Sequence, residues 1–92
     1  MIVRISTEGQ YRLPSSLLDR LNEIDNEIVE AVAGNDATTF GRLYSQLISL
    51  IRTNGEHIPD AELVGSDIIL PPADTTIEEA RELFVEDGAI PG

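Results

Sequence analysis

Residues 15–54 read SSLLDRLNEIDNEIVEAVAGNDATTFGRLYSQLISLIRTN, and this stretch determines the architecture of the chain. Its apolar residues recur mostly at steps of three and four, the spacing of amphipathic helices. The first apolar stripe comprises Leu17, Leu18, Leu21, Ile24, Ile28 and Val32. The second comprises Phe40, Leu43, Tyr44, Leu47, Ile48 and Ile51. The polar face of the first helix carries Asp19, Arg20, Glu23, Asp25, Glu27 and Glu30.

A short break between the two stripes predicts a helical hairpin. The segment Ala33–Asp36 interrupts the apolar period, and Gly34 suits the left-handed residue that follows many helices. The candidate N-caps are Ser15 or Ser16 for the first helix and Asn35 or Asp36 for the second. Asn54 and Gly55 end the second helix. A linker of about three residues makes the two helices antiparallel neighbours.

The segments on either side predict a small sheet. Met1–Ser6 is β-branched and alternating, and Gln10–Leu13 returns after a turn in which Gly9 suits a positive φ. Ile68–Leu70 predicts a third short strand, because two prolines prevent its continuation. The segment from His57 to Asp60 predicts a loop.

The end of the chain predicts a third helix near Thr76–Glu86. Its capping box is Thr76 with Glu79 or Thr75 with Glu78. We therefore expect an α+β fold in a single domain, residues 1–92: an N-terminal β-hairpin plus a third short strand, a central antiparallel helical hairpin and a C-terminal helix.

Each apolar stripe is broader than a single helix contact. We expect two helices and three short strands to leave part of both stripes uncovered, which would favour association. The sequence thus predicts a homodimer formed through the helical hairpin or through the edge strand Met1–Ile5.

The charge of the chain restricts its partners. Seventeen acidic residues face six arginines, and the net charge is −11. Such a surface argues against nucleic acid and against anionic lipid, and it suits a basic protein partner. No apolar run reaches the length of a membrane span, so we expect a cytoplasmic protein without direct membrane insertion.

The sequence predicts no catalytic, cofactor-binding or metal site. Cysteine is absent, which excludes thiol chemistry and disulfides. His57 is the only histidine, and its acidic neighbours Glu56 and Asp60 are weak evidence for a metal ion. No phosphate-binding or nucleophile motif is present. Arg12 has two interpretations: an exposed strand arginine pairing with Glu8 or Glu62, or a contact to an acidic partner.

Three stretches together resemble the PspA-associated protein family (PspAA). They are Met1–Ile5 with Glu8–Arg12, Glu62–Val64 with Ser66–Pro72, and Ile77–Phe84 with Asp87–Gly92. The resemblance covers essentially the whole chain and implies a context in the envelope-stress response, with no catalytic residues to carry over. It implies as partner phage shock protein A (PspA), a long helical, coiled-coil protein that assembles on membranes.

The leading hypothesis is a non-enzymatic interaction module. Its candidate partner-binding residues are Tyr11, Arg12, Leu21, Ile28, Tyr44 and Ile48. The alternatives are a self-associating structural protein and a small carboxylate- or metal-dependent enzyme.

Overall fold

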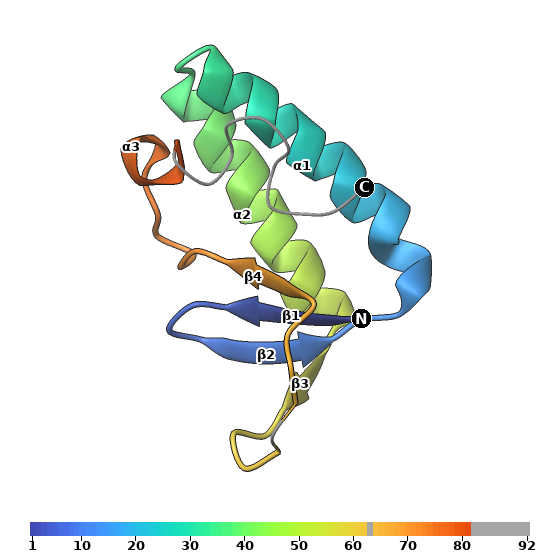
Figure 1. The fold of residues 1–92 in the computed structure, drawn as a ribbon. Helices are drawn as coiled ribbons and strands as arrows, with labels where there is room; N and C mark the ends of the chain where they lie inside the picture. Colours follow the sequence, from blue (N-terminus) through green and yellow to red (C-terminus); the bar gives the residue numbers. More distant parts are fainter. Residues whose placement is uncertain (63, 82–92) are drawn as a thin grey trace.

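The computed structural model describes residues 1–62 and 64–81, which form an α+β fold (Figure 1). In chain order the elements are β1 (Ile2–Ile5), β2 (Gly9–Arg12), a 3-10 turn η1 (Ser15–Leu17), α1 (Leu18–Ala33), α2 (Ala37–Asn54), β3 (Glu56–Ile58), β4 (Ile68–Leu70) and α3 (Ile77–Ala80). The predicted fold class is confirmed, including the helical hairpin.

The ends of the two long helices follow the expected chemistry only in part. The Asp36 carboxylate accepts a hydrogen bond from the Thr39 backbone N–H at 3.1 Å and caps α2, as expected. The predicted caps Ser15 and Ser16 are wrong, because both lie in η1 and no side chain caps α1. The left-handed residue of the connection is Asn35, with φ of 54°, and Gly34 has φ of −85°.

The four strands form one mixed sheet in the order β3-β2-β1-β4. β1 pairs antiparallel with β2 and parallel with β4, so the expected third strand is confirmed. β3 pairs antiparallel with β2, with His57 opposite Tyr11. The predicted loop is therefore wrong for His57 and Ile58 and begins only at Pro59. The expectation that Met1–Ile5 forms an edge is also wrong, because β4 covers the free side of β1.

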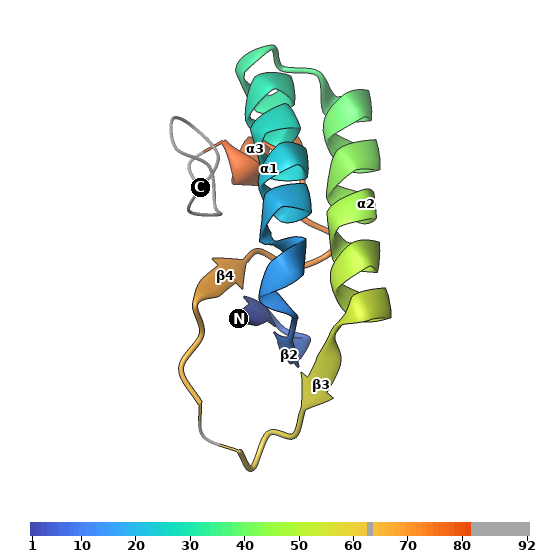
Figure 2. The same cartoon turned by 90° about the vertical axis from the view of Figure 1, so that its right-hand side faces the viewer.

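One face of the sheet packs against the helical hairpin (Figures 1 and 2). Val3 and Ile5 of β1 alternate with Ile2 and Arg4, and the register places them beside Ile68 and Leu70 of β4. These inward-facing residues are at most 4 % exposed. The alternation of the strands thus separates a buried face from an open one.

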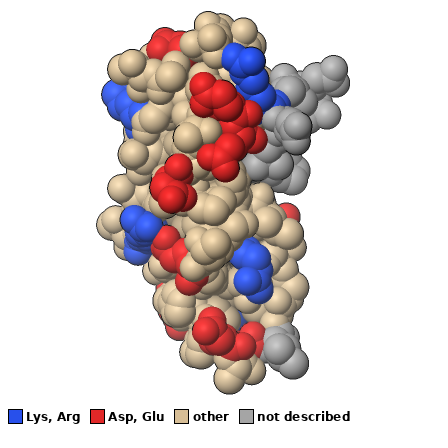
Figure 3. Space-filling model, turned by 90° about the vertical axis from the view of Figure 1, so that its left-hand side faces the viewer, with Lys and Arg blue, Asp and Glu red and all other residues tan. Residues whose placement is uncertain are grey.

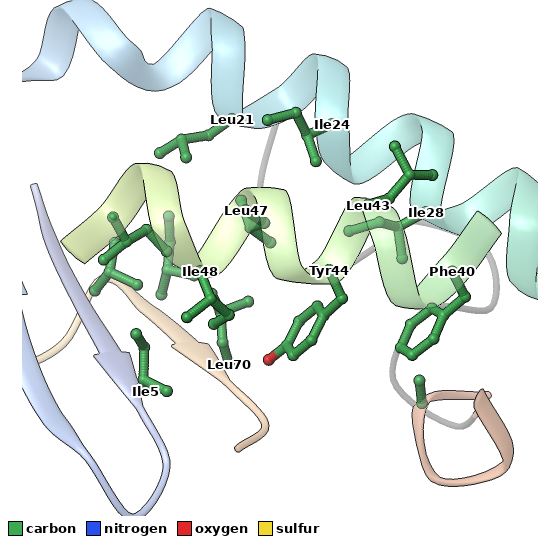
Figure 4. Packing of buried hydrophobic residues seen from close by; sticks show 14 of the residues in the cluster. Ile5, Leu21, Ile24, Ile28, Phe40, Leu43, Tyr44, Leu47, Ile48 and Leu70 are labelled. Atoms are coloured by element: carbon green, nitrogen blue, oxygen red, sulfur yellow. The ribbon is translucent and has the colours of Figure 1, made fainter. Parts of the chain in front are cut away.

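Helix α2 occupies the centre of the molecule (Figure 4). Leu21, Ile24 and Ile28 extend from α1 onto one side of it, while Ile48 and Tyr44 point toward the strands. Phe40 points toward α3 and stacks on Tyr44, with ring centroids 5.6 Å apart. The broad apolar stripe of α2 is therefore divided between two layers, α1 on one side and the strands with α3 on the other.

The expectation that the stripes remain uncovered is wrong. Every residue of the α2 stripe is at most 3 % exposed, and the α1 stripe is buried from Leu21 onward. Because a single copy covers both stripes except Leu17 and Leu18, which are partly buried, the stripes supply little reason for dimerisation through the hairpin.

Helix α3 begins at the capping box expected for Thr76 and Glu79. Thr76 Oγ1 accepts from the Glu79 backbone N–H at 3.3 Å, and Glu79 Oε1 accepts from the Thr76 backbone N–H at 3.1 Å. The part of the predicted helix beyond Arg81 lies outside the described residues. Ahead of α3, the Tyr44 hydroxyl donates to the Pro71 carbonyl and so joins the end of β4 to α2.

Candidate functional site

Four of the six candidate partner-binding residues lie in the hydrophobic core. Leu21 and Ile28 are 0 % exposed, and Tyr44 and Ile48 are 2 % exposed. They pack between α1, α2 and the sheet, so their role in this conformation is to hold these layers together (Figure 4). The two candidates that remain at the surface are Tyr11 and Arg12, neighbours on β2 that point to opposite faces of the sheet.

Tyr11 belongs to a polar cluster at the helix-facing side of the sheet. Its hydroxyl donates to Glu8 Oε2 at 2.7 Å, and Arg52 Nε donates to the same oxygen at 2.9 Å. The Arg52 bond is the main cause that lowers the pKa of Glu8 to about 2, and the bond to Glu8 raises the pKa of Tyr11. The ring of His57 meets that of Tyr11 edge-on at 5.3 Å.

This cluster is a structural tie between distant elements. Glu8 lies in the β1–β2 turn, Arg52 in the last turn of α2, and His57 on β3. Bidentate arginine–carboxylate bonding fixes geometry more firmly than a single bond. Because Glu8 pairs with Arg52, the predicted pairing of Glu8 with Arg12 is wrong.

Arg12 lies on the open face of the sheet and is exposed. Its register partner on β1 is Ile2, and its partner on β3 is Glu56. Within the described part of the chain, no carboxylate lies within 4 Å of its guanidinium, so the expected pair with Glu62 is also absent. Arg12 is thus a surface cation available to another molecule.

Three more residues join Arg12 on this face, and we call the group the open-face patch. Its members are Ile2, Arg4, Arg12 and Ile69. Arg4 lies directly between Gln10 on β2 and Ile69 on β4. The Ile69 side chain is 59 % exposed and is the only large apolar side chain classed as exposed in the described residues.

The other half of the open face is covered by the chain itself. Gln10 Nε2 donates to the Val64 carbonyl at 3.1 Å and to Ser66 Oγ at 2.8 Å, so the segment 64–67 lies over β2 here. Gln10 and Ile58 are consequently buried. The open-face patch is the part of this face of the sheet that the segment does not cover.

Sequence reasoning found Arg12 but missed Ile69 and Arg4. The run Ile68-Ile69-Leu70 is continuously apolar, and nothing in it shows which residue points outward. The alternation of Met1–Ser6 did contain the signal, since it separates Ile2 and Arg4 from Val3 and Ile5. Pairing β4 beside β1 in parallel register then places Ile69 with Arg4.

The described residues contain no group of three or more potential metal ligands, and His57 is exposed beside Gly9. None of the helices in residues 1–62 and 64–81 combines the length and apolarity that a membrane crossing requires.

Acidic and basic side chains are interspersed on the face of the molecule seen in Figure 3, where groups of carboxylates lie beside and between the arginines. Among the described residues, two arginines form ion pairs within 4 Å: Arg20 with Glu23, and Arg52 with Glu8. Arg81 donates to the Asn35 side-chain oxygen.

These features define a small acidic α+β protein with a helix-covered mixed sheet and an arginine- and isoleucine-bearing open face. The chain belongs to the PspA-associated protein family, PspAA, whose family model matches residues 1–92. The resemblance seen in the sequence is therefore confirmed, and the family is named for its association with PspA. No curated protein and no solved structure matched the chain in the same comparisons.

Proposed function

We propose that this protein is a non-enzymatic interaction module that binds PspA and acts with it in the cytoplasm during envelope stress. The match of the PspAA family model to residues 1–92 carries this proposal. The surface chemistry agrees with a binding role, because its distinctive exposed group is an apolar side chain, Ile69, beside the cation Arg4. Apolar anchors beside arginines are typical of protein interfaces.

Binding in purified form tests the proposal. The tagged 92-residue chain is immobilised and exposed to purified PspA, with an unrelated tagged protein of similar size and negative charge as the control. We expect PspA to be retained by this chain and not by the control. Equal retention by both, or by neither, contradicts the proposal, and co-purification from the native host provides the same test in cells.

Self-association remains the second candidate, now through a different surface. β4 is an edge strand of the sheet and carries the exposed Ile69, and exposed edges pair with other chains. Light scattering at micromolar concentration distinguishes the states: a monomer mass removes the homodimer. A carboxylate- or metal-dependent enzyme has no comparable observation in its favour among the described residues.

A further inference from the structure

The open-face patch combines two cations with an apolar side chain on a rigid support. Arg4 and Ile2 alternate with the buried residues of β1, the central strand between β2 and β4. Ile69 stands next to Arg4 on β4, and Arg12 stands opposite Ile2 on β2. Since the strands fix all four positions, the patch presents its chemistry without rearrangement.

The two arginines lack the partners that acidic proteins usually supply. Glu56 faces Arg12 across β2 and β3, yet no carboxylate of the described residues lies within 4 Å of Arg4 or Arg12. Asp67 is already engaged, because its Oδ2 accepts from the Ile2 backbone N–H at 2.7 Å. Within the described part of the chain, both guanidinium groups thus keep their donors free for planar, bidentate recognition of carboxylates.

Local carboxylates restrict the direction of approach. Asp60 and Glu62 line the same hollow as Arg4 on the side of the covering segment. An acidic partner therefore meets Arg4 from the β4 side, where Ile69 lies. Repulsion from the remaining acidic surface is screened beyond a Debye length of about 8 Å at physiological ionic strength, whereas arginine–carboxylate pairs form at closer range.

The size of the open face limits what it can hold. Strands of four residues are about 13 Å long, and four strands are about 19 Å wide, so the whole face measures roughly 250 Å². A stable complex of two globular proteins buries about 800 Å² on each partner. A second copy of this chain is therefore too large an occupant, while a single helix of about 10 Å diameter fits the face.

We propose that the open-face patch binds an acidic helical segment of a partner protein. Ile69 packs against an apolar residue of that segment, while Arg4 on β1 and Arg12 on β2 pair with carboxylates farther from the β4 edge. The inference rests on the proposed function, because the segment belongs to PspA. The proposed preference for an acidic segment is confined to this face, whereas the overall charge of the protein suits a basic partner.

Three variants test the patch in binding experiments with purified PspA. Arg4→Gln, Arg12→Gln and Ile69→Ser each weaken binding about fivefold or more, and Arg4→Gln with Arg12→Gln weakens it further. Arg42→Gln is the matched control, since Arg42 is an exposed arginine on α2 and forms no ion pair within 4 Å to any residue that the structure describes. It changes the affinity less than twofold. Melting temperatures near that of the wild type show that the variants remain folded.

The outcomes separate this inference from the proposed function. No binding of wild-type chain to PspA overturns both. Wild-type binding with patch variants that bind equally well, or with an equal loss for Arg42→Gln, overturns the patch alone. If the chain is a dimer and Ile69→Ser converts it to a monomer, the patch binds a second copy and the inference is overturned too. Synthetic peptides covering PspA complete the test: capture of an acidic peptide supports the inference, and capture of a basic one contradicts it.

Discussion

Arg52 and Glu8 are 44 residues apart in the sequence and form a bidentate pair, in which the guanidinium of Arg52 donates to both carboxylate oxygens of Glu8. The pair joins the last turn of α2 to the tip of the β1–β2 hairpin. Tyr11 donates to the same carboxylate and makes the arrangement a three-membered network. The helical hairpin and the sheet are thereby tied at the surface as well as through the core.

Glu8→Gln should lower the free energy of unfolding by about 1 kcal/mol at neutral pH, because the ion pair is partly exposed and screened. The pKa of Glu8 is lowered from 4.5 to about 2, mainly by the bond from Arg52. A lowered pKa stabilises the fold above pH 4.5, and this contribution is lost as the pH falls toward 2. Urea unfolding across this range should show a shallower acid decline for the variant than for the wild type. Glu23→Gln should change little, because the Glu23 side chain is 69 % exposed in its pair with Arg20.

Asp36→Ala should destabilise the protein by about 1 kcal/mol, because it removes the acceptor for the Thr39 N–H at the start of α2. Ser16→Ala is the matched comparison, since the Ser16 side chain caps no helix, and its stability should remain within error of the wild type. Thermal unfolding measures both. An equal loss for the two variants would contradict the capping assignment.

Two glycines of α2, Gly41 inside the helix and Gly55 at its C-cap, should respond to alanine in opposite directions. At Gly41 an added Cβ meets nothing within 4 Å, so Gly41→Ala should stabilise α2 by about 1 kcal/mol. At Gly55 the added Cβ would lie 2.5 Å from the Ile51 carbonyl oxygen and 2.9 Å from Tyr11 Cβ. Gly55→Ala should therefore destabilise by about 1–3 kcal/mol. If the denaturant midpoint shifts in the same direction for both variants, the packing described at Gly55 is contradicted.

Tyr44→Phe should cost about 1 kcal/mol at neutral pH, because the Pro71 carbonyl loses its donor while the ring stays packed on Phe40. Burial raises the pKa of Tyr44 above its ordinary value of 10. A raised pKa stabilises the fold below pH 10, and this contribution is lost as the pH rises above it. The wild type should accordingly lose stability more steeply than the variant in alkaline solution. If the stability of the wild type and of the variant falls equally steeply with rising pH, the burial of the Tyr44 hydroxyl is contradicted.

The helical hairpin was predictable because its signal is local. Apolar residues at helical spacing, the break at 33–36 and the cap at Asp36 all lie within one stretch, and helices form from contacts between near neighbours. The capping box at Thr76 is equally local. By contrast, Asp25 appears on the polar face by spacing and is 2 % exposed in the fold, since neighbouring elements and not periodicity determine what is covered.

The features missed by sequence reasoning all depend on distant partners. Strand β3 has three residues, two of them polar, and exists because Tyr11 pairs with His57 across the intervening hairpin. The covering of Tyr44 and Ile48 depends on the side of α2 against which the sheet packs. The open-face patch required the parallel register of Arg4 with Ile69, which no local pattern contains.

The parallel pairing of β1 with β4 also orders events in time. Asp67 and Ile2, bonded at the start of that pairing, are 65 residues apart, so the loop between them must close before the sheet is complete. During synthesis β1 leaves the ribosome before β4, so the two strands can pair only after residues 68–70 have emerged. The helical hairpin is built from contacts between residues close in sequence, so it can form in that interval. Strand β1 is thus made before the other elements of the sheet and is among the last to acquire both of its neighbours.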